Sequence, residues 1–110
     1  MRKYGNVVTE FRGKRFDSKR EMRRYAELAL MERTGEISDL RTQVQYMLIP
    51  SQKDENGKTV ERQITYKADF VYRDKAGKEV VEDCKGYKTE VYKLKRKLMR
   101  YIYGINVLET

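Results

Sequence analysis

Residues 64–85 read ITYKADFVYRDKAGKEVVEDCK, and this stretch decides the fold of the chain. Over residues 64–73, aromatic and branched side chains alternate with polar ones, which predicts a strand. Side-chain alternation would put Tyr66, Ala68 and Phe70 on one face and Asp69 on the other. A glycine turn follows at residues 74–78, and residues 78–85 have the pattern of a second strand. We therefore expect an antiparallel hairpin.

The length of the turn decides whether two acids of this hairpin meet. A three-residue loop, 75–77, pairs Asp74 with Lys78, and the same register then pairs Asp69 with Asp83. Gly77 suits the left-handed position that such a loop requires. A two-residue loop would instead put the two aspartates on opposite faces. Directly opposed residues have Cβ atoms about 5 Å apart, so the longer loop predicts neighbouring carboxylates.

Neighbouring carboxylates point to a metal ion. Two unit charges about 4 Å apart cost roughly 4 kcal/mol at an effective dielectric constant near 20, and a divalent cation removes this cost. Lys85 lies two residues after Asp83 and so shares its face, whereas Glu82 points the other way. Ordinary ion pairs with lysine or arginine neighbours would also explain each aspartate singly. The pair together favours a metal site inside a basic protein, which suggests phosphodiester chemistry on nucleic acid.

A third acid, Glu21, stands upstream at the start of a predicted helix. Ser18 and Glu21 fit the capping-box pattern, and Gly35 follows the predicted last turn near Thr34. Glu21 therefore has a structural role available. It gains a catalytic one if the amino end of this helix faces the hairpin.

The remaining elements complete an α+β fold. Residues 7–11 and 14–16 flank Arg12-Gly13 as a short N-terminal hairpin, and Gln43–Pro50 forms a strand before a turn at Asn56-Gly57. Thr89 caps a second helix to Tyr103, Gly104 ends it, and Ile105–Leu108 is a last strand. We predict one domain over residues 1–110, with an α/β core in the order αβββαβ. Its mixed four-stranded sheet is flanked by helices, and the last strand is parallel to a neighbour.

The composition of the chain excludes several classes of active site and partner. The chain has 110 residues, with 25 Lys and Arg against 17 Asp and Glu, and its net charge of +8 favours a polyanionic partner such as DNA. It has no histidine, which excludes Ser-His-Asp triads and His-containing zinc sites. A single cysteine, Cys84, permits no intrachain disulfide and fits a reducing cytoplasm. No apolar run reaches membrane-spanning length, so we expect no membrane partner.

The second helix concentrates the positive charge. Acids are nearly absent after Glu90, which is unusual for an ordinary solvated helix. We expect it to pack through an apolar stripe at positions 91, 94, 98 and 102, and to contact phosphates with its basic side. The candidate DNA-binding residues of the chain are Arg20, Arg24, Lys67, Lys88, Lys93, Lys95, Lys97 and Arg100.

These residues together resemble the PD-(D/E)XK nuclease superfamily. Its motif is an Asp on one strand and then Asp or Glu, any residue and Lys on the next, which Asp69 and the run 83–85 match. The segments 16–21, 66–70 and 82–86 more closely resemble a small phage and prophage endonuclease family likened to Holliday junction resolvases. Here the first Asp follows Ala68 where the motif has Pro.

The resemblance implies a restriction-endonuclease-like core and a metal-dependent mechanism. Asp69, Asp83 and the Cys84 carbonyl would hold Mg²⁺ or Mn²⁺, and Glu21 would act through water or a second ion. Lys85 would orient or deprotonate the attacking water, or stabilise the developing charge. The Cys84 thiol would point away from the acids and be buried and inert. The implied activity is a magnesium-dependent endonuclease acting on branched or recombination-intermediate DNA, encoded by a phage or prophage.

The sequence leaves several alternatives open. A nicking endonuclease or an exonuclease of the same fold would use the same residues. A cutting subunit active only with a partner, or a nucleic-acid-binding module with an inactive site, would keep the fold and lose independent cleavage. A homodimer is a further arrangement that the sequence permits.

Overall fold

The computed structural model describes residues 9–11 and 13–110. Its helices and strands, in chain order, are β1 (Thr9–Phe11), β2 (Lys14–Phe16), α1 (Lys19–Arg33), β3 (Ser38–Ile49), β4 (Gln52–Lys53), β5 (Thr59–Glu61), β6 (Ile64–Arg73), β7 (Glu79–Asp83), α2 (Glu90–Tyr103) and β8 (Leu108–Glu109).

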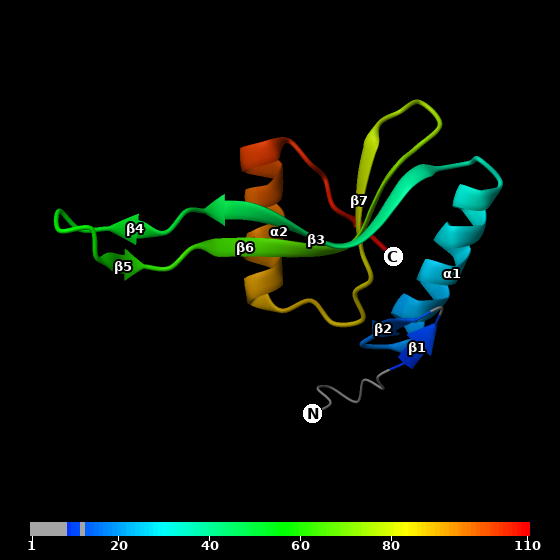
Figure 1. The fold of residues 1–110 in the computed structure, drawn as a ribbon, viewed down its shortest axis with the longest axis horizontal. Helices are drawn as coiled ribbons and strands as arrows, with labels where there is room; N and C mark the ends of the chain where they lie inside the picture. Colours follow the sequence, from blue (N-terminus) through cyan, green and yellow to red (C-terminus); the bar gives the residue numbers. More distant parts are fainter. Residues whose placement is uncertain (1–8, 12) are drawn as a thin grey trace.

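The main sheet has four strands in the order β3-β6-β7-β8. β3, β6 and β7 are antiparallel, and β8 joins β7 in parallel after the α2 crossover, as predicted. The α+β class and the αβββαβ order are confirmed (Figure 1). β3 begins at Ser38, five residues before the predicted start, and β8 occupies 108–109 in place of 105–108.

Both helices begin and end at the predicted signals. The Ser18 Oγ accepts a hydrogen bond from the Glu21 N–H at 3.2 Å, and the Thr89 Oγ1 accepts one from the Tyr92 N–H at 3.0 Å. Each bond satisfies an amide that the first helical turn leaves unpaired. Gly104 ends α2 with φ +69°, a left-handed conformation that costs glycine little. These caps fix where each helix meets the sheet.

The register of the β6–β7 hairpin is also as predicted. Arg73 pairs with Glu79 and Phe70 with Glu82. The Asp74 N–H donates to the Lys78 carbonyl at 2.9 Å, which encloses a three-residue loop. Gly77 within it has φ +83°, the left-handed position that this loop requires.

The predicted alternation of faces along β6 is wrong beyond Ala68. Tyr66, Ala68 and Val71 pack in one core with α2, whereas Phe70 and Tyr72 pack in a second core with α1. The two faces exchange at Asp69, which sits between these sets. Opposite it on β3, Gln43 has φ +55°, a left-handed conformation that reverses which side the next residues face. The paired strands β3 and β6 are strongly twisted in this part of the sheet (Figure 1).

Beyond this twist, β3 and β6 continue into a projecting arm, residues 50–63, that contains β4 and β5. Every residue of the arm is exposed. It accounts for the elongated shape, 53 × 38 × 25 Å, and for a radius of gyration of 16.2 Å, against about 13 Å expected for a compact chain of this length. Gly57 turns the arm with φ +82°, which confirms the predicted turn.

The N-terminal hairpin is confirmed where the structure describes it, since β1 pairs with β2 from Thr9↔Phe16 to Phe11↔Lys14. Val7, Val8 and Arg12 of the predicted hairpin lie outside the described residues. Phe16 is buried against the ring of Tyr25, with centroids 5.2 Å apart, and this contact attaches the hairpin to α1. No helix in residues 9–11 and 13–110 has the length and apolarity to cross a membrane.

Candidate functional site

Two carboxylates meet where β6 passes β7. The hairpin register, extended by one residue beyond Phe70↔Glu82, places Asp69 opposite Asp83. The Asp69 Oδ2 accepts the Cys84 N–H at 2.8 Å, and the Asp83 Oδ2 accepts the Tyr66 hydroxyl at 2.6 Å. Both side chains are therefore held by the hairpin itself.

The electrostatics show that burial and negative neighbours disfavour the ionised form of Asp69. Burial, the hydrogen bond to Asp83, the negative charge of Asp83 and, to a smaller extent, that of Glu21 together raise the pKa of Asp69 to about 8. A carboxyl in this state takes up either a proton or a cation near neutral pH. The site is thus suited to a positive ligand that both carboxylates can share.

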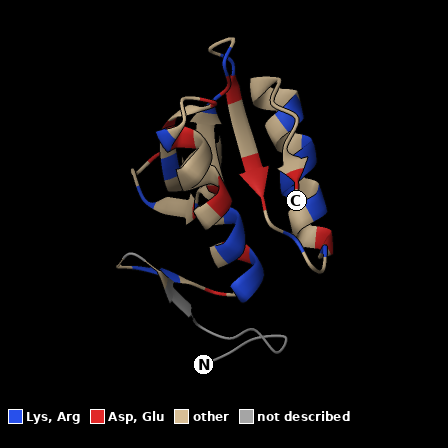
Figure 2. Cartoon of the chain, turned by 90° about the vertical axis from the view of Figure 1, so that its right-hand side faces the viewer, with Lys and Arg blue, Asp and Glu red and all other residues tan. Residues whose placement is uncertain are grey.

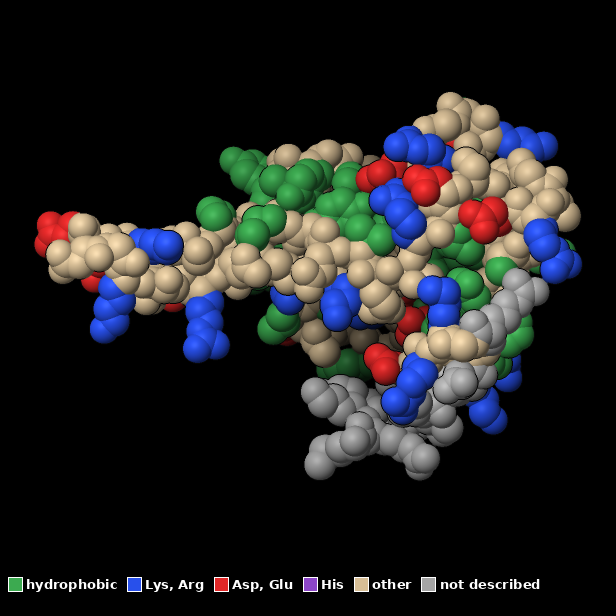
Figure 3. All heavy atoms as spheres, in the orientation of Figure 1, with side chains coloured by type: hydrophobic (Ala, Val, Ile, Leu, Met, Phe, Trp, Pro, Cys, Tyr) green, Lys and Arg blue, Asp and Glu red, His purple; other side chains and the backbone are tan. Residues whose placement is uncertain are grey.

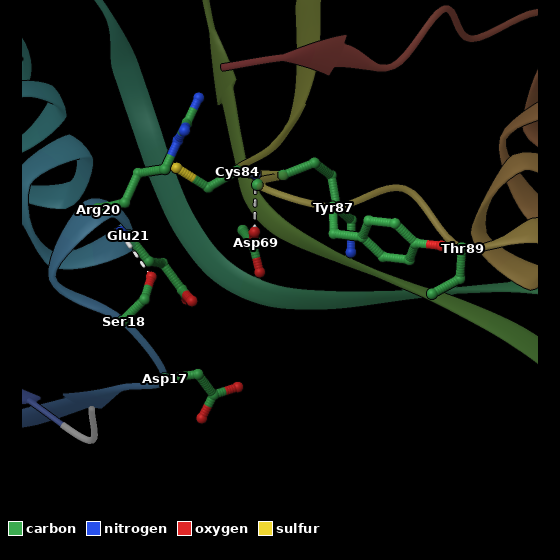
Figure 4. Close-up of a pocket in the computed structure, with 10 residues that line it drawn as sticks. Asp17, Ser18, Arg20, Glu21, Asp69, Cys84, Tyr87 and Thr89 are labelled. Atoms are coloured by element: carbon green, nitrogen blue, oxygen red, sulfur yellow. Dashed lines mark hydrogen bonds between the residues drawn. The ribbon is translucent and has the colours of Figure 1, made fainter. Parts of the chain in front are cut away.

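Glu21 adds a third carboxylate from the first turn of α1. It is 7 % exposed, and burial raises its pKa to about 7, helped by the charges of Asp17 and Asp83. Its Oε2 accepts the Gln43 Nε2–H at 3.2 Å. The amino end of α1 therefore faces the hairpin, the condition for a role beyond capping. Figure 4 shows Glu21 and Asp69 pointing into one pocket, with Asp17 at its lower edge.

The pocket has a volume of about 470 Å³ and is lined by α1, β6 and the loop that follows β7. Its lining residues are Asp17, Ser18, Arg20, Glu21, Asp69, Cys84, Lys85, Gly86, Tyr87 and Thr89. Asp83 lies behind this wall, 1 % exposed, and lines a second, smaller pocket. Lys85 and Thr89 line both pockets and so separate them.

Lys85 places a cation beside Asp83. Its Nζ lies 3.7 Å from the Asp83 Oδ2 and 4.6 Å from the centre of the Tyr92 ring. The first contact lowers the repulsion between the carboxylates, and the second is a cation–π contact that limits where the ammonium can move. Lys85 therefore shares the face of Asp83, as alternation predicts.

The donor set fits a hard divalent cation held by few protein ligands. In the described part of the chain, no three Asp, Glu or Cys side chains converge on one point as a complete metal cage. Two neighbouring carboxylates and a backbone carbonyl at Cys84 suit Mg²⁺, which keeps several waters and is usually held by one or two carboxylates. Asp69 and Asp83 fit this role, with Glu21 within electrostatic reach.

The Cys84 side chain differs from its prediction. It is half-buried and lines the acidic pocket beside Arg20 (Figure 4), not the core under Tyr66 and Phe70. Its Sγ accepts the Thr110 hydroxyl at 3.7 Å, and burial raises the pKa of the thiol. Cys84 and Asp83 line different pockets, so at this position the side of the chain away from Asp83 meets the acidic pocket and not the core.

On the side of α1, Arg24 and Glu82 join the helix to β7. The Glu82 carboxylate is fully buried and accepts the Arg24 Nε at 2.7 Å and the Arg24 Nη2 at 2.9 Å. Tyr72 and Thr110 also donate to it. The remaining guanidinium nitrogen of Arg24 pairs with Glu27 at 3.2 Å. Arg24, a candidate DNA ligand by sequence, is thus engaged inside the fold, one helical turn after Glu21.

The helix α2 packs through a side that includes Leu98 of the predicted stripe but is centred on other residues. Tyr92 and Met99 are its buried residues, whereas Val91 and Leu94 of the predicted stripe are 62 % and 58 % exposed. Two basic residues at α2 bind the Glu109 carboxylate: Lys88 at 3.0 Å and Arg96 at 2.9 Å. Arg96 was not among the predicted ligands, and Lys88 was.

The other basic residues of α2 are positioned differently. Lys93, Lys97 and Arg100 recur at helical spacing on one side of α2, and we call this set the basic face. Figure 2 shows Lys and Arg along both helices and the acidic end of β7 between them. The acidic site thus lies in a positively charged surrounding.

Sequence reasoning missed three contributors to the site. Tyr66 was expected to be a core residue, yet its hydroxyl holds Asp83. Gln43 binds Glu21, and Asp17 raises its pKa. Asp17 directly precedes the capping box, so its sequence position could have indicated that it lies near Glu21. No local feature of the sequence indicated the contact of Gln43 with Glu21.

Comparison with known proteins identifies one family. No curated protein and no solved structure matches the chain. A family model described as "Protein of unknown function (DUF1064)" matches residues 1–108 and so takes in the whole site described above. The chain therefore belongs to the DUF1064 family.

Proposed function

We propose that this protein is a metal-dependent deoxyribonuclease of the PD-(D/E)XK type that cleaves phosphodiester bonds of branched DNA. The observation that carries the proposal is the pairing of Asp69, which lines the acidic pocket with Glu21 and Lys85, with Asp83 directly behind the pocket wall. The resemblance to a phage or prophage endonuclease family supports the same reaction. DUF1064 itself carries no functional description.

Each site residue has a distinct part in the proposed reaction. Asp69 and Asp83 would hold Mg²⁺ or Mn²⁺ with the Cys84 carbonyl, and such an ion supplies a polarised phosphate and an acidified water. Lys85 would stabilise negative charge on the phosphate, since its ammonium is 3.7 Å from Asp83 and opens to both pockets. Glu21, with a pKa of about 7, would accept the proton of the attacking water near neutral pH.

The duplex would be held mainly through its phosphates. The basic face of α2 offers three cations, and Arg20 is exposed at the edge of the acidic pocket. Of the basic-face cations, Lys93 has only an exposed partner, Glu90, at 3.3 Å, and a contact of that kind contributes little. Phosphate contacts position DNA without reading its sequence, which agrees with selection of DNA shape.

The decisive experiment is a cleavage assay with the purified full chain. Supercoiled plasmid, linear duplex and a four-way junction are incubated with Mg²⁺, Mn²⁺ or EDTA. We expect metal-dependent cleavage, fastest on the junction, and its loss in Asp83→Asn. Glu55→Gln, at the exposed arm tip, is the matched control and should cleave like the wild type.

Metal binding is tested independently of cleavage. Calorimetric titration with Mn²⁺ should show binding to the wild type and to Glu55→Gln and none to Asp83→Asn. Equal Mn²⁺ binding by all three proteins would remove the metal site from the hairpin. DNA binding without cleavage under any metal would favour an inactive binding module over a nuclease.

A further inference from the structure

The second pocket, behind the acidic one, has its own chemical character. It has a volume of about 260 Å³ and lies between β6 and the first turns of α2. Lys67, Lys85 and Lys95 line it, and Asp83 is its only carboxylate. Three ammonium groups thus face one acid.

The two outer lysines have no acidic partner among the side chains that the structure describes. In residues 11 and 13–110, neither Lys67 nor Lys95 has a carboxylate within ion-pair distance, in contrast to Lys88 with its partner Glu109 at 3.0 Å. Asp83 cannot neutralise them all, because it is 1 % exposed and already accepts the Tyr66 hydroxyl and pairs with Lys85. The pocket therefore has uncompensated positive charge at its mouth.

Part of the pocket wall is apolar and is formed by Tyr66, Val91 and Tyr92. Val91 is 62 % exposed beside it, and the Tyr92 ring is buried with the Lys85 ammonium over its face. An anion that also carries apolar surface fits such walls better than a small inorganic ion does. A phosphate attached to a sugar has both parts.

The position of the pocket relates it to the acidic site. Thr89, labelled at the right of the acidic pocket in Figure 4, lines the second pocket as well, and so does Lys85. The two pockets therefore adjoin at Lys85 and Thr89, the arrangement that neighbouring phosphates of one strand would require. A free nucleotide would fill only one of them.

We propose that the second pocket binds a phosphodiester group of the nucleic-acid strand whose neighbouring phosphate lies at the acidic site. Lys67 and Lys95 are its phosphate ligands, and Val91 contacts the sugar. This assignment deepens the proposed nuclease function and rests on it for the position of the neighbouring phosphate.

The test measures binding without metal, so that it does not depend on cleavage. Fluorescence anisotropy with a labelled single strand in EDTA compares the wild type with Lys67→Ala/Lys95→Ala. The matched control is Lys75→Ala/Lys78→Ala, which removes the same charge from the exposed hairpin turn. We expect at least a tenfold loss of affinity in the pocket variant and less than a threefold loss in the control. The slope of log K against log salt should fall by about 0.7 for the one phosphate released.

Two further measurements make the outcome decisive. Lys67→Arg/Lys95→Arg keeps the charge and should recover most of the affinity, which separates phosphate binding from a folding defect. Thymidine monophosphate competes with the labelled strand in a parallel titration. Equal losses in the pocket and control variants would overturn the proposal, and so would tighter binding of the monophosphate than of the strand. A selective loss in a protein that cleaves nothing would support the pocket and refute the nuclease.

Discussion

The acidic pocket predicts how the stability of the metal-free protein depends on pH. Asp69 and Glu21 titrate near 3.8 and 4.5 when unperturbed, but near pH 8 and pH 7 in the fold. Between these values the native state holds protons that the unfolded chain has released. The stability contributed by these groups is therefore complete below about pH 4, and it decreases as the pH rises through 7 and 8.

The size of the effect can be worked out from the two shifts. Each group changes the free energy of unfolding by at most about 1.4 kcal/mol per pH unit, so two groups lose about 5 kcal/mol between pH 5.5 and 7.5. Mutual repulsion and partial contact with solvent lower this figure, and we expect a loss of about 2 to 3 kcal/mol. The chain contains no histidine, so no imidazole titrates in the same window.

Urea unfolding in EDTA at pH 5.5 and 7.5 measures this loss. Asp69→Asn should flatten the dependence and raise the stability at pH 7.5, because it removes the charge that burial penalises. Glu55→Gln, whose side chain is exposed, should behave like the wild type. Mn²⁺ should stabilise the wild type more at pH 7.5 than at pH 5.5. The reasoning is refuted if Asp69→Asn keeps the full pH dependence.

Three other substitutions separate chemistry, folding and DNA contact. Lys85→Ala should bind DNA with nearly wild-type affinity and lose about 100-fold or more in single-turnover cleavage, and near-normal cleavage would reduce Lys85 to an ion-pair partner. Arg24→Met leaves the buried Glu82 without its cation and should lower the free energy of unfolding by about 3 to 5 kcal/mol in urea titration, and a loss below about 1 kcal/mol would contradict this role. Replacing the basic face (Lys93, Lys97 and Arg100) with alanine should lower the salt slope of duplex binding by about 2 to 3, equally for every DNA sequence, whereas an unchanged slope would place the duplex elsewhere.

The hairpin shows how far local sequence rules extend. The register of β6 and β7 is set by the length of the loop that joins them. Gly77 made a three-residue loop predictable, because few other residues adopt φ +83° without strain. The pairing of Asp69 with Asp83 could then be predicted by counting residues back along both strands from the loop. Helix ends at Ser18, Thr89 and Gly104 were predictable for the same reason, since capping depends on near neighbours.

What could not be predicted depends on contacts distant in sequence. The exchange of faces at Asp69 lies opposite the left-handed Gln43 on the neighbouring strand, and nothing local to β6 indicates it. The outward position of Val91 and Leu94 reverses a periodic stripe, because Tyr92 and Met99 fit the sheet better. By its local sequence, Arg24 resembles the exposed cations around it. Its buried partner Glu82 is 58 residues away in sequence, so local rules could not predict the ion pair.

The arm and the acidic site belong to the same pair of strands. β6 carries Asp69 and begins three residues after the end of β5, and β3 carries Gln43 opposite it and ends just before β4. The arm therefore extends the same two strands that face each other at Gln43 and Asp69 (Figure 3). Because every residue of the arm is exposed, a molecule bound at its tip would be held by these two strands without entering the acidic pocket.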